Sequence, residues 1–205
     1  MIPTGLGQAQ ERYQFTFPEL YLHFLQLGCF DPFHERYLQL ADLLWLPPAQ
    51  IARHRFHRQQ IDGLIPFART AQEDLWCFYP AIDEGTGQAV VFCPDEDEVA
   101  SIYAPDFEAF VYRAMLEEYA CTGLTEHYEV NQAPEVLRGF TAFLQSWLKP
   151  AWAHRLQEVD RLPWQRDANG YYGAIDVEIL NAILAADLAY DRLDEEFEHF
   201  IDDED

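Results

Sequence analysis

The acidic side chains are the first group in this sequence whose spacing could do chemistry. Residues 95–98 put four consecutive carboxylates into a predicted loop. Such a run can bind an Arg- or Lys-bearing surface through charge-assisted hydrogen bonds. A solvated turn after a strand is the open alternative. The ligand spacing of an EF-hand loop is missing, so we expect no metal there.

A second acidic segment runs from residue 176 to residue 205. It holds 12 acidic residues and one basic residue, Arg192, which gives it a net charge of −11. Either it steers a cationic partner, or it is the solubilising, frayed end of a helix that finishes in the run Asp202–Asp205. From the two segments we predict one partner-binding set. Its members are Asp95, Glu96, Asp97, Glu98, Asp194, Glu195 and Glu196.

Catalytic patterns are weak by comparison. The only serines, Ser101 and Ser146, lie outside any G-x-S-x-G turn. The pair His54 and His57 would share one face of a helix, but no third metal ligand lies nearby. Among 36 acidic residues, pairs suited to acid–base chemistry arise by chance, and context singles none out. We predict no enzyme activity, no cofactor and no metal; an enzyme using paired carboxylates is the distant alternative.

The overall charge narrows the class of partner. The 205 residues carry 13 Lys and Arg against 36 Asp and Glu, a formal net charge of −23 at pH 7. Such a surface repels nucleic-acid phosphates and anionic lipid heads. We therefore predict a basic protein partner, no nucleic acid and no membrane. Hydrophobic residues make up 49% and aromatic residues 15%, which is enough for a large core and excludes wholesale disorder.

We predict the cellular compartment from the N-terminal residues, the length of apolar stretches and the spacing of the cysteines. The first ten residues lack the cationic segment and the apolar segment of a signal peptide. No uninterrupted apolar stretch approaches the length of a transmembrane helix. The cysteines form no C-x-x-C pair, so we expect reduced thiols that pack as small hydrophobes. They are Cys29, Cys77, Cys93 and Cys121. The predicted location is cytoplasmic.

Proline and glycine mark the helices that must position these residues. We predict helices that begin near Pro18, Pro47, Pro105 and Pro134 and end near Gly28, Arg58, Gly123 and Pro150. Residues 151–172 look irregular and end at the turn signal Asn169-Gly170. Within that stretch Trp152 and Trp164 are either core residues or partly exposed partner anchors. A last apolar helical stripe covers residues 175–188 and is extended by Leu193, Phe197 and Phe200.

A different pattern lies in the middle of the chain. Leu75–Tyr79 and Ala89–Cys93 are short, apolar and rich in aromatic or β-branched residues, and a glycine-containing loop joins them. This pattern predicts a β-hairpin. Ile61–Ala68 reads as a further strand at an edge, because Pro66 cannot donate a ladder hydrogen bond. We predict an α+β fold with a mainly antiparallel sheet flanked by helices, divided into a domain of residues 1–125 and a helical extension of residues 126–205 packed on it.

Three stretches in order resemble the SMI1/KNR4 family of the SUKH superfamily. The stretches are Phe17–Gly28, then Leu64–Arg69 followed by Asp74–Tyr79, then Val90–Cys93 followed by an acidic turn and Ala104–Phe110. The likeness covers about residues 15–118. The family usually has a glycine in the polar turn before the aromatic strand, whereas Thr70–Glu73 has none. We expect this turn to form without a positive φ angle.

The resemblance implies a function as well as a fold. Bacterial members of the superfamily include immunity proteins that neutralise polymorphic toxins, often nucleases, and other members are regulatory or scaffold proteins. An acidic inhibitor suits a nuclease, because it can occupy a basic cleft in place of phosphates and associate fast. We therefore expect a cognate toxin domain as the partner. An intracellular regulatory or scaffold role is the alternative, and the oligomeric state stays open.

Overall fold

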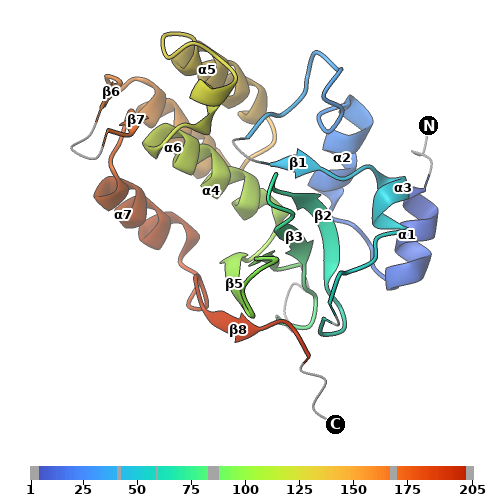
Figure 1. Cartoon of the computed structure of the whole chain (residues 1–205). Coiled ribbons are helices and arrows are strands. Elements are labelled where there is room, and N and C mark those ends of the chain that lie inside the picture. The colour runs from blue at the N-terminus through green and yellow to red at the C-terminus, as the bar shows by residue number, and fades with distance from the viewer. Residues whose placement is uncertain (1–4, 41–42, 59, 83–87, 167–169, 202–205) are drawn as a thin grey trace. The chain divides into compact units, whose positions relative to one another are not determined.

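A computed structural model describes residues 5–40, 43–58, 60–82, 88–166 and 170–201 (Figure 1). The chain divides into two compact units. The first unit is Met1–Tyr37, Asp42–Phe107 and Asp191–Asp205, and the second is Leu38–Ala41 and Glu108–Tyr190. No helix among the described residues is both long and apolar enough to cross a bilayer.

The first unit is built on a six-stranded antiparallel sheet of order β1-β2-β3-β4-β5-β8. Its strands are β1 (Leu44–Trp45), β2 (Ile65–Arg69), β3 (Leu75–Phe78), β4 (Val90–Cys93), β5 (Val99–Ala104) and β8 (Glu196–Glu198). Its helices are α1 (Leu6–Tyr13), α2 (Glu19–Leu27), the single turn α3 (Pro48–Ile51) and the first residue of α4 (Phe107–Ala120). The predicted α+β class with an antiparallel sheet is confirmed.

Aromatic rings fill the core of the first unit. Phe67 of β2 and Phe78 of β3 lie with ring centroids 4.5 Å apart, and Phe107 lies 5.8 Å from Phe67. Tyr21 of α2 meets Phe107 edge to face at 5.4 Å. All four side chains are buried. Large buried rings in tilted and edge-to-face contact bury much apolar surface and stabilise this sheet.

Helix α2 begins and ends where the sequence predicts. Pro18 caps its start, and Gly28 ends it with a φ of 80°. A Cβ atom at Gly28 would come within 2.6 Å of the His34 ring, so only glycine fits both the backbone angle and the space. The predicted helix between Pro18 and Gly28 is confirmed.

Two local predictions in the sheet need correction. Glu73 has a φ of 72°, so the turn before β3 does use a positive φ angle and uses it without glycine. Strand β2 is not an edge strand, since β1 lies beyond it. Pro66 is nevertheless tolerated, because the two residues of β1 pair only with Ala68 and Arg69 and leave Pro66 without a strand on that side.

The second unit is mainly helical. After the rest of α4 come a 3₁₀ turn (Gly123–Glu126), α5 (Ala133–Leu144), α6 (Pro150–Asp160), the short strands β6 (Gln165–Arg166) and β7 (Tyr172–Gly173), and α7 (Val177–Leu188). The prediction that residues 151–172 are irregular is wrong for α6. Pro150 occupies the first turn of that helix, where its missing N–H costs nothing. Asn169 of the predicted turn lies outside the described residues.

The helical extension predicted for Leu193, Phe197 and Phe200 is wrong. Helix α7 ends at Leu188, because Ala189 has a φ of 44° and leaves the right-handed helical region. The chain then forms β8, in which Glu196 and Glu198 are exposed and Phe197 is half-buried. This alternation has the two-residue period of a strand, which the helical interpretation overlooked.

Candidate functional site

Strand β8 brings the two acidic segments together. It pairs with β5 in the register Val99↔Glu198, Ala100↔Phe197 and Ser101↔Glu196 (Figure 1). Because β5 directly follows the loop of residues 95–98, this register sets that loop beside the end of β8. We call the result the acidic edge. Its residues are Asp95, Glu96, Asp97, Glu98, Asp194, Glu195, Glu196 and Glu198.

His199 fastens the loop to the strand. Its backbone N–H donates to the Glu98 carbonyl at 3.0 Å. Its Nε2 lies 2.9 Å from the Asp97 carbonyl, which can only accept, so Nε2 carries the proton. Burial lowers the pKa of His199, and the Asp97 hydrogen bond and charge act in the opposite direction. The sequence prediction missed His199; its only signal was one histidine inside the acidic run.

Further hydrogen bonds shape the loop from within. The Asp97 side chain accepts from the Val99 N–H at 3.1 Å, and the Asp95 N–H donates to the Asp74 carboxylate at 3.0 Å. Asp74 also accepts from the Thr70 hydroxyl at 2.9 Å. Asp95 is half-buried, whereas Glu96 and Glu98 are exposed and their side chains face solvent. The loop therefore presents glutamates on a backbone that aspartates hold in place.

The acidic residues around β8 are not equivalent. Arg192 binds Glu195 with two hydrogen bonds of 2.8 Å, and this contact lowers the pKa of Glu195. The same guanidinium donates to the Ile82 carbonyl. Glu196 and Glu198 are exposed on the strand itself. Of the predicted binding residues here, Glu195 thus already has an internal cation, while Glu196 presents its charge to solvent. The run Asp202–Asp205 lies outside the described residues.

An aromatic strip runs across the sheet toward the acidic edge. The register aligns Trp76, Phe92, Ser101 and Glu196 on four successive strands, and directly paired residues point to the same face. The rings of Trp76 and Phe92 lie 4.7 Å apart and both are half-buried. These two rings therefore lie on the sheet face that also carries the side chain of Glu196.

The aromatic anchors named from the sequence lie elsewhere. Trp152 is only 6% exposed, and its indole N–H donates to the Asp187 carbonyl at 3.3 Å. Its interpretation as an exposed anchor is therefore wrong. Trp164 is half-buried, with its ring 5.3 Å from Tyr172.

Arg69 and Arg58 have contacts within the first unit. Arg69 forms an ion pair with Glu73, and the Arg58 guanidinium lies 4.9 Å from the centroid of the Phe200 ring. Helix α3 ends at Ile51, so His54 and His57 do not share a helical face. In the described part of the chain, no group of three or more His, Cys, Asp or Glu side chains could hold a metal ion.

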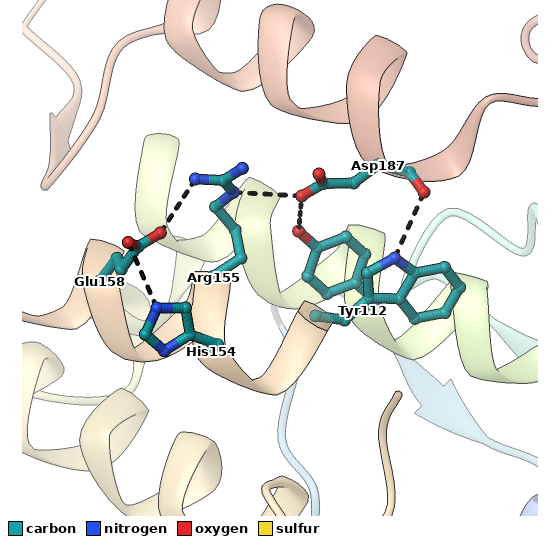
Figure 2. Close-up of polar contacts among 6 residues, drawn as sticks. Tyr112, His154, Arg155, Glu158 and Asp187 are labelled. Atoms are coloured by element: carbon teal, nitrogen blue, oxygen red, sulfur yellow. Dashed lines mark hydrogen bonds and ion pairs between the residues drawn. The ribbon is translucent and has the colours of Figure 1, made fainter. Parts of the chain in front are cut away.

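A second polar cluster lies within the second unit. Figure 2 shows Asp187 of α7 between Tyr112 of α4 and Arg155 of α6. The Tyr112 hydroxyl donates to Asp187 at 2.5 Å, and Arg155 donates to the same oxygen at 3.2 Å. Burial, followed by the hydrogen bond to Asp187, raises the pKa of Tyr112. The Tyr112 hydroxyl therefore keeps its proton, and its hydrogen bond to Asp187 helps to join α4, α6 and α7.

These features define an α+β domain on an antiparallel sheet whose last strand carries an exposed acidic edge. The chain belongs to the SMI1 / KNR4 family (SUKH-1), whose family model matches residues 6–113. The match runs from α1 into α4 and contains the loop of residues 95–98, but β8 lies outside it. No curated protein and no solved structure matches the chain.

Proposed function

We propose that this protein is a non-enzymatic binding module that uses its acidic edge to bind a basic protein. One observation carries the proposal: β8 joins the sheet beside the loop of residues 95–98, so two acidic segments far apart in the sequence form one surface. A concentrated negative surface attracts a cationic partner and raises its association rate.

The partner that fits this surface best is a toxin domain, which makes the protein an immunity protein acting in the cytoplasm. A nuclease must hold phosphates and therefore presents a basic cleft. Exposed carboxylates at Glu96, Glu98, Glu196 and Glu198 can occupy such a cleft in place of phosphates. Membership of a generally non-enzymatic family supports a binding role over catalysis. A regulatory or scaffold role with another basic partner is the alternative within the same family.

The test compares two variants of equal charge. The edge variant is Glu96→Gln, Glu98→Gln, Glu196→Gln and Glu198→Gln; the control variant is Glu11→Gln, Glu19→Gln, Glu35→Gln and Asp62→Asn. All eight side chains are exposed in the first unit. Both variants weaken the long-range field equally, so a difference between them reports the location of the binding surface.

The partner to test is the candidate toxin domain encoded by the neighbouring gene. At low salt we expect the edge variant to associate about tenfold more slowly and the control variant to stay within about threefold of the unmodified protein. Co-expression should rescue growth with the unmodified protein and fail with the edge variant. Equal kinetics for the two variants would count against the acidic edge. Tight binding to a basic protein that is not a toxin would favour the scaffold role.

A further inference from the structure

The outer side of β8 has a defined hydrogen-bonding geometry. The Glu98 carbonyl accepts from the His199 N–H, and the Ile102 N–H donates to the Glu195 carbonyl at 2.9 Å. In an antiparallel ladder, hydrogen-bonded and non-hydrogen-bonded pairs alternate. Phe197 lies between Glu195 and His199 in this alternation. Its backbone N–H and C=O groups therefore also point toward β5. Glu196 and Glu198 direct their backbone N–H and C=O groups to the other side, away from the sheet.

This side is open at Glu196 and Glu198. Among the described residues, no strand pairs with the outer side of these two residues. The next pairing along the chain lies on the β5 side, because the His199 N–H donates to the Glu98 carbonyl and the His199 carbonyl accepts from the Ile61 N–H at 3.0 Å, beside the bridge between Phe200 and Gln60. Gln60 and Ile61 therefore lie on the same side of the strand as β5 and leave the outer edge unfilled.

The strand that carries the edge is held rigidly. The ring of Phe197 stacks on Tyr79 of the chain beyond β3, with centroids 5.5 Å apart and planes at 21°. His199 is completely buried and bound to the loop carbonyl of Asp97. A docking segment would therefore meet a preorganised edge, which lowers the entropy lost on binding.

Charge selects the occupant of the edge. A second copy of this chain would bring its own glutamates opposite Glu196 and Glu198, and like charges directly across a ladder are destabilising. A segment with Lys or Arg at alternate positions would instead place cations beside both glutamates. Resting on the function proposed above, we infer that the partner binds by adding an extended, Lys- or Arg-bearing segment to the outer edge of β8 as a further strand of the sheet.

The first measurement is amide hydrogen exchange of the full-length protein. The probe is a capped heptapeptide of alternating Lys and Val with Lys at both ends. When it is bound, exchange of the Glu196 and Glu198 N–H groups should slow by about tenfold or more, because both become ladder donors. The Phe197 N–H already faces β5 and should change little, which makes it an internal control for local folding.

The second measurement separates strand addition from simple charge attraction. A control peptide carries N-methyl groups on two adjacent central residues, which blocks both of its edges and leaves its charge unchanged. It should bind about tenfold more weakly, since backbone hydrogen bonds are lost. Glu196→Gln with Glu198→Gln should weaken the unmethylated peptide while the Phe197 N–H stays protected.

Equal affinity for the two peptides, or unchanged exchange at Glu196 and Glu198 in a saturated complex, would overturn strand addition. Binding of neither peptide at low salt would overturn it as well. These outcomes leave the function proposed above to its own test, since the edge and control variants can still differ in their binding of the toxin domain.

Discussion

In the first unit Phe67, Phe78 and Phe107 meet ring to ring, whereas in the second unit Tyr112 and Tyr119 bury hydroxyl groups that need partners. The core of the first unit is mostly apolar and depends mainly on shape and volume, although the Tyr21 hydroxyl is also buried within it. The core of the second unit depends on hydrogen bonds between helices. When one partner of such a bond is removed, the other is left buried and unpaired, and the loss of stability exceeds the net contribution of the intact bond. The two units should therefore respond differently to substitution.

The polar contacts of the second unit repeat along α4. Tyr119 shares a hydrogen bond of 2.8 Å with Thr141 of α5 and donates to Asp160 at 3.3 Å. Asp160 in turn accepts from Arg138 at 3.2 Å. The family match ends at residue 113, so this network belongs to the part of the chain that the family model does not cover. A polar network suits a region that must fix the relative register of several helices.

The largest expected effect is in the apolar core. Phe67→Ala removes a fully buried ring and should lower the free energy of unfolding by about 3–5 kcal/mol. Urea unfolding checks this, with Phe33→Ala as the control, because Phe33 is 97% exposed and should change stability by less than about 0.5 kcal/mol. A loss below about 1 kcal/mol for Phe67→Ala would contradict the apolar core.

The next effect is in the polar cluster of the second unit. Asp187→Ala leaves the Tyr112 hydroxyl and Arg155 without their shared acceptor and should cost about 1–3 kcal/mol. Glu178→Ala on the exposed face of the same helix is the control. Adding Tyr112→Phe should recover part of the loss, since the unpaired hydroxyl is then gone. Strictly additive effects would show that the two side chains do not act as a pair.

A third prediction concerns acid and His199. Burial lowers its pKa in the folded protein below the ordinary value, so the unfolded chain takes up a proton first as the pH falls. The contribution of His199 to the free energy of unfolding should therefore be fully present above about pH 6.5. Below that pH, the free energy of unfolding should fall by at most about 1.4 kcal/mol per pH unit for this one group. Asp97 and Arg58 are the charged neighbours that modify this titration.

His199→Gln tests this dependence, because glutamine can still donate to the Asp97 carbonyl but does not titrate. Urea midpoints between pH 7 and pH 5 should fall less steeply in this variant. His154→Gln, which changes an exposed histidine of the second unit, is the matched control. The same slope in His199→Gln and the unmodified protein would mean that another group governs the acid response.

The sequence predicted the first unit well where local signals act. Proline and glycine delimited α2, and the aromatic strands Leu75–Phe78 and Val90–Cys93 pair as a hairpin. The sequence prediction failed at β8. Leu193, Phe197 and Phe200 fit a helical stripe, and only the pairing with β5 shows that this segment is a strand. Tertiary pairing overrides local pattern in short segments.

The acidic edge was predictable in its parts and not in its assembly. Acidic runs are visible in any sequence, so residues 95–98 and 194–196 could be named. Their meeting requires the register Ser101↔Glu196, which no local pattern encodes. The roles of Arg192, which neutralises Glu195, and of His199, which fastens the loop, also depend on contacts that only the fold creates.

The smallest effect lies in the turn before β3, where the first unit is strained at its surface. Glu73 holds a φ of 72°, which costs a residue with a Cβ about 1–2 kcal/mol relative to glycine. Glycine gives back about 0.4–1 kcal/mol through the entropy of the unfolded chain. Glu73→Gly should therefore be more stable than Glu73→Ala by about 0.5–1 kcal/mol. Both variants lose the ion pair with Arg69, so their difference isolates the backbone. Urea midpoints decide the order, and a more stable alanine variant would show that the turn relaxes out of the left-handed region once the ion pair is gone.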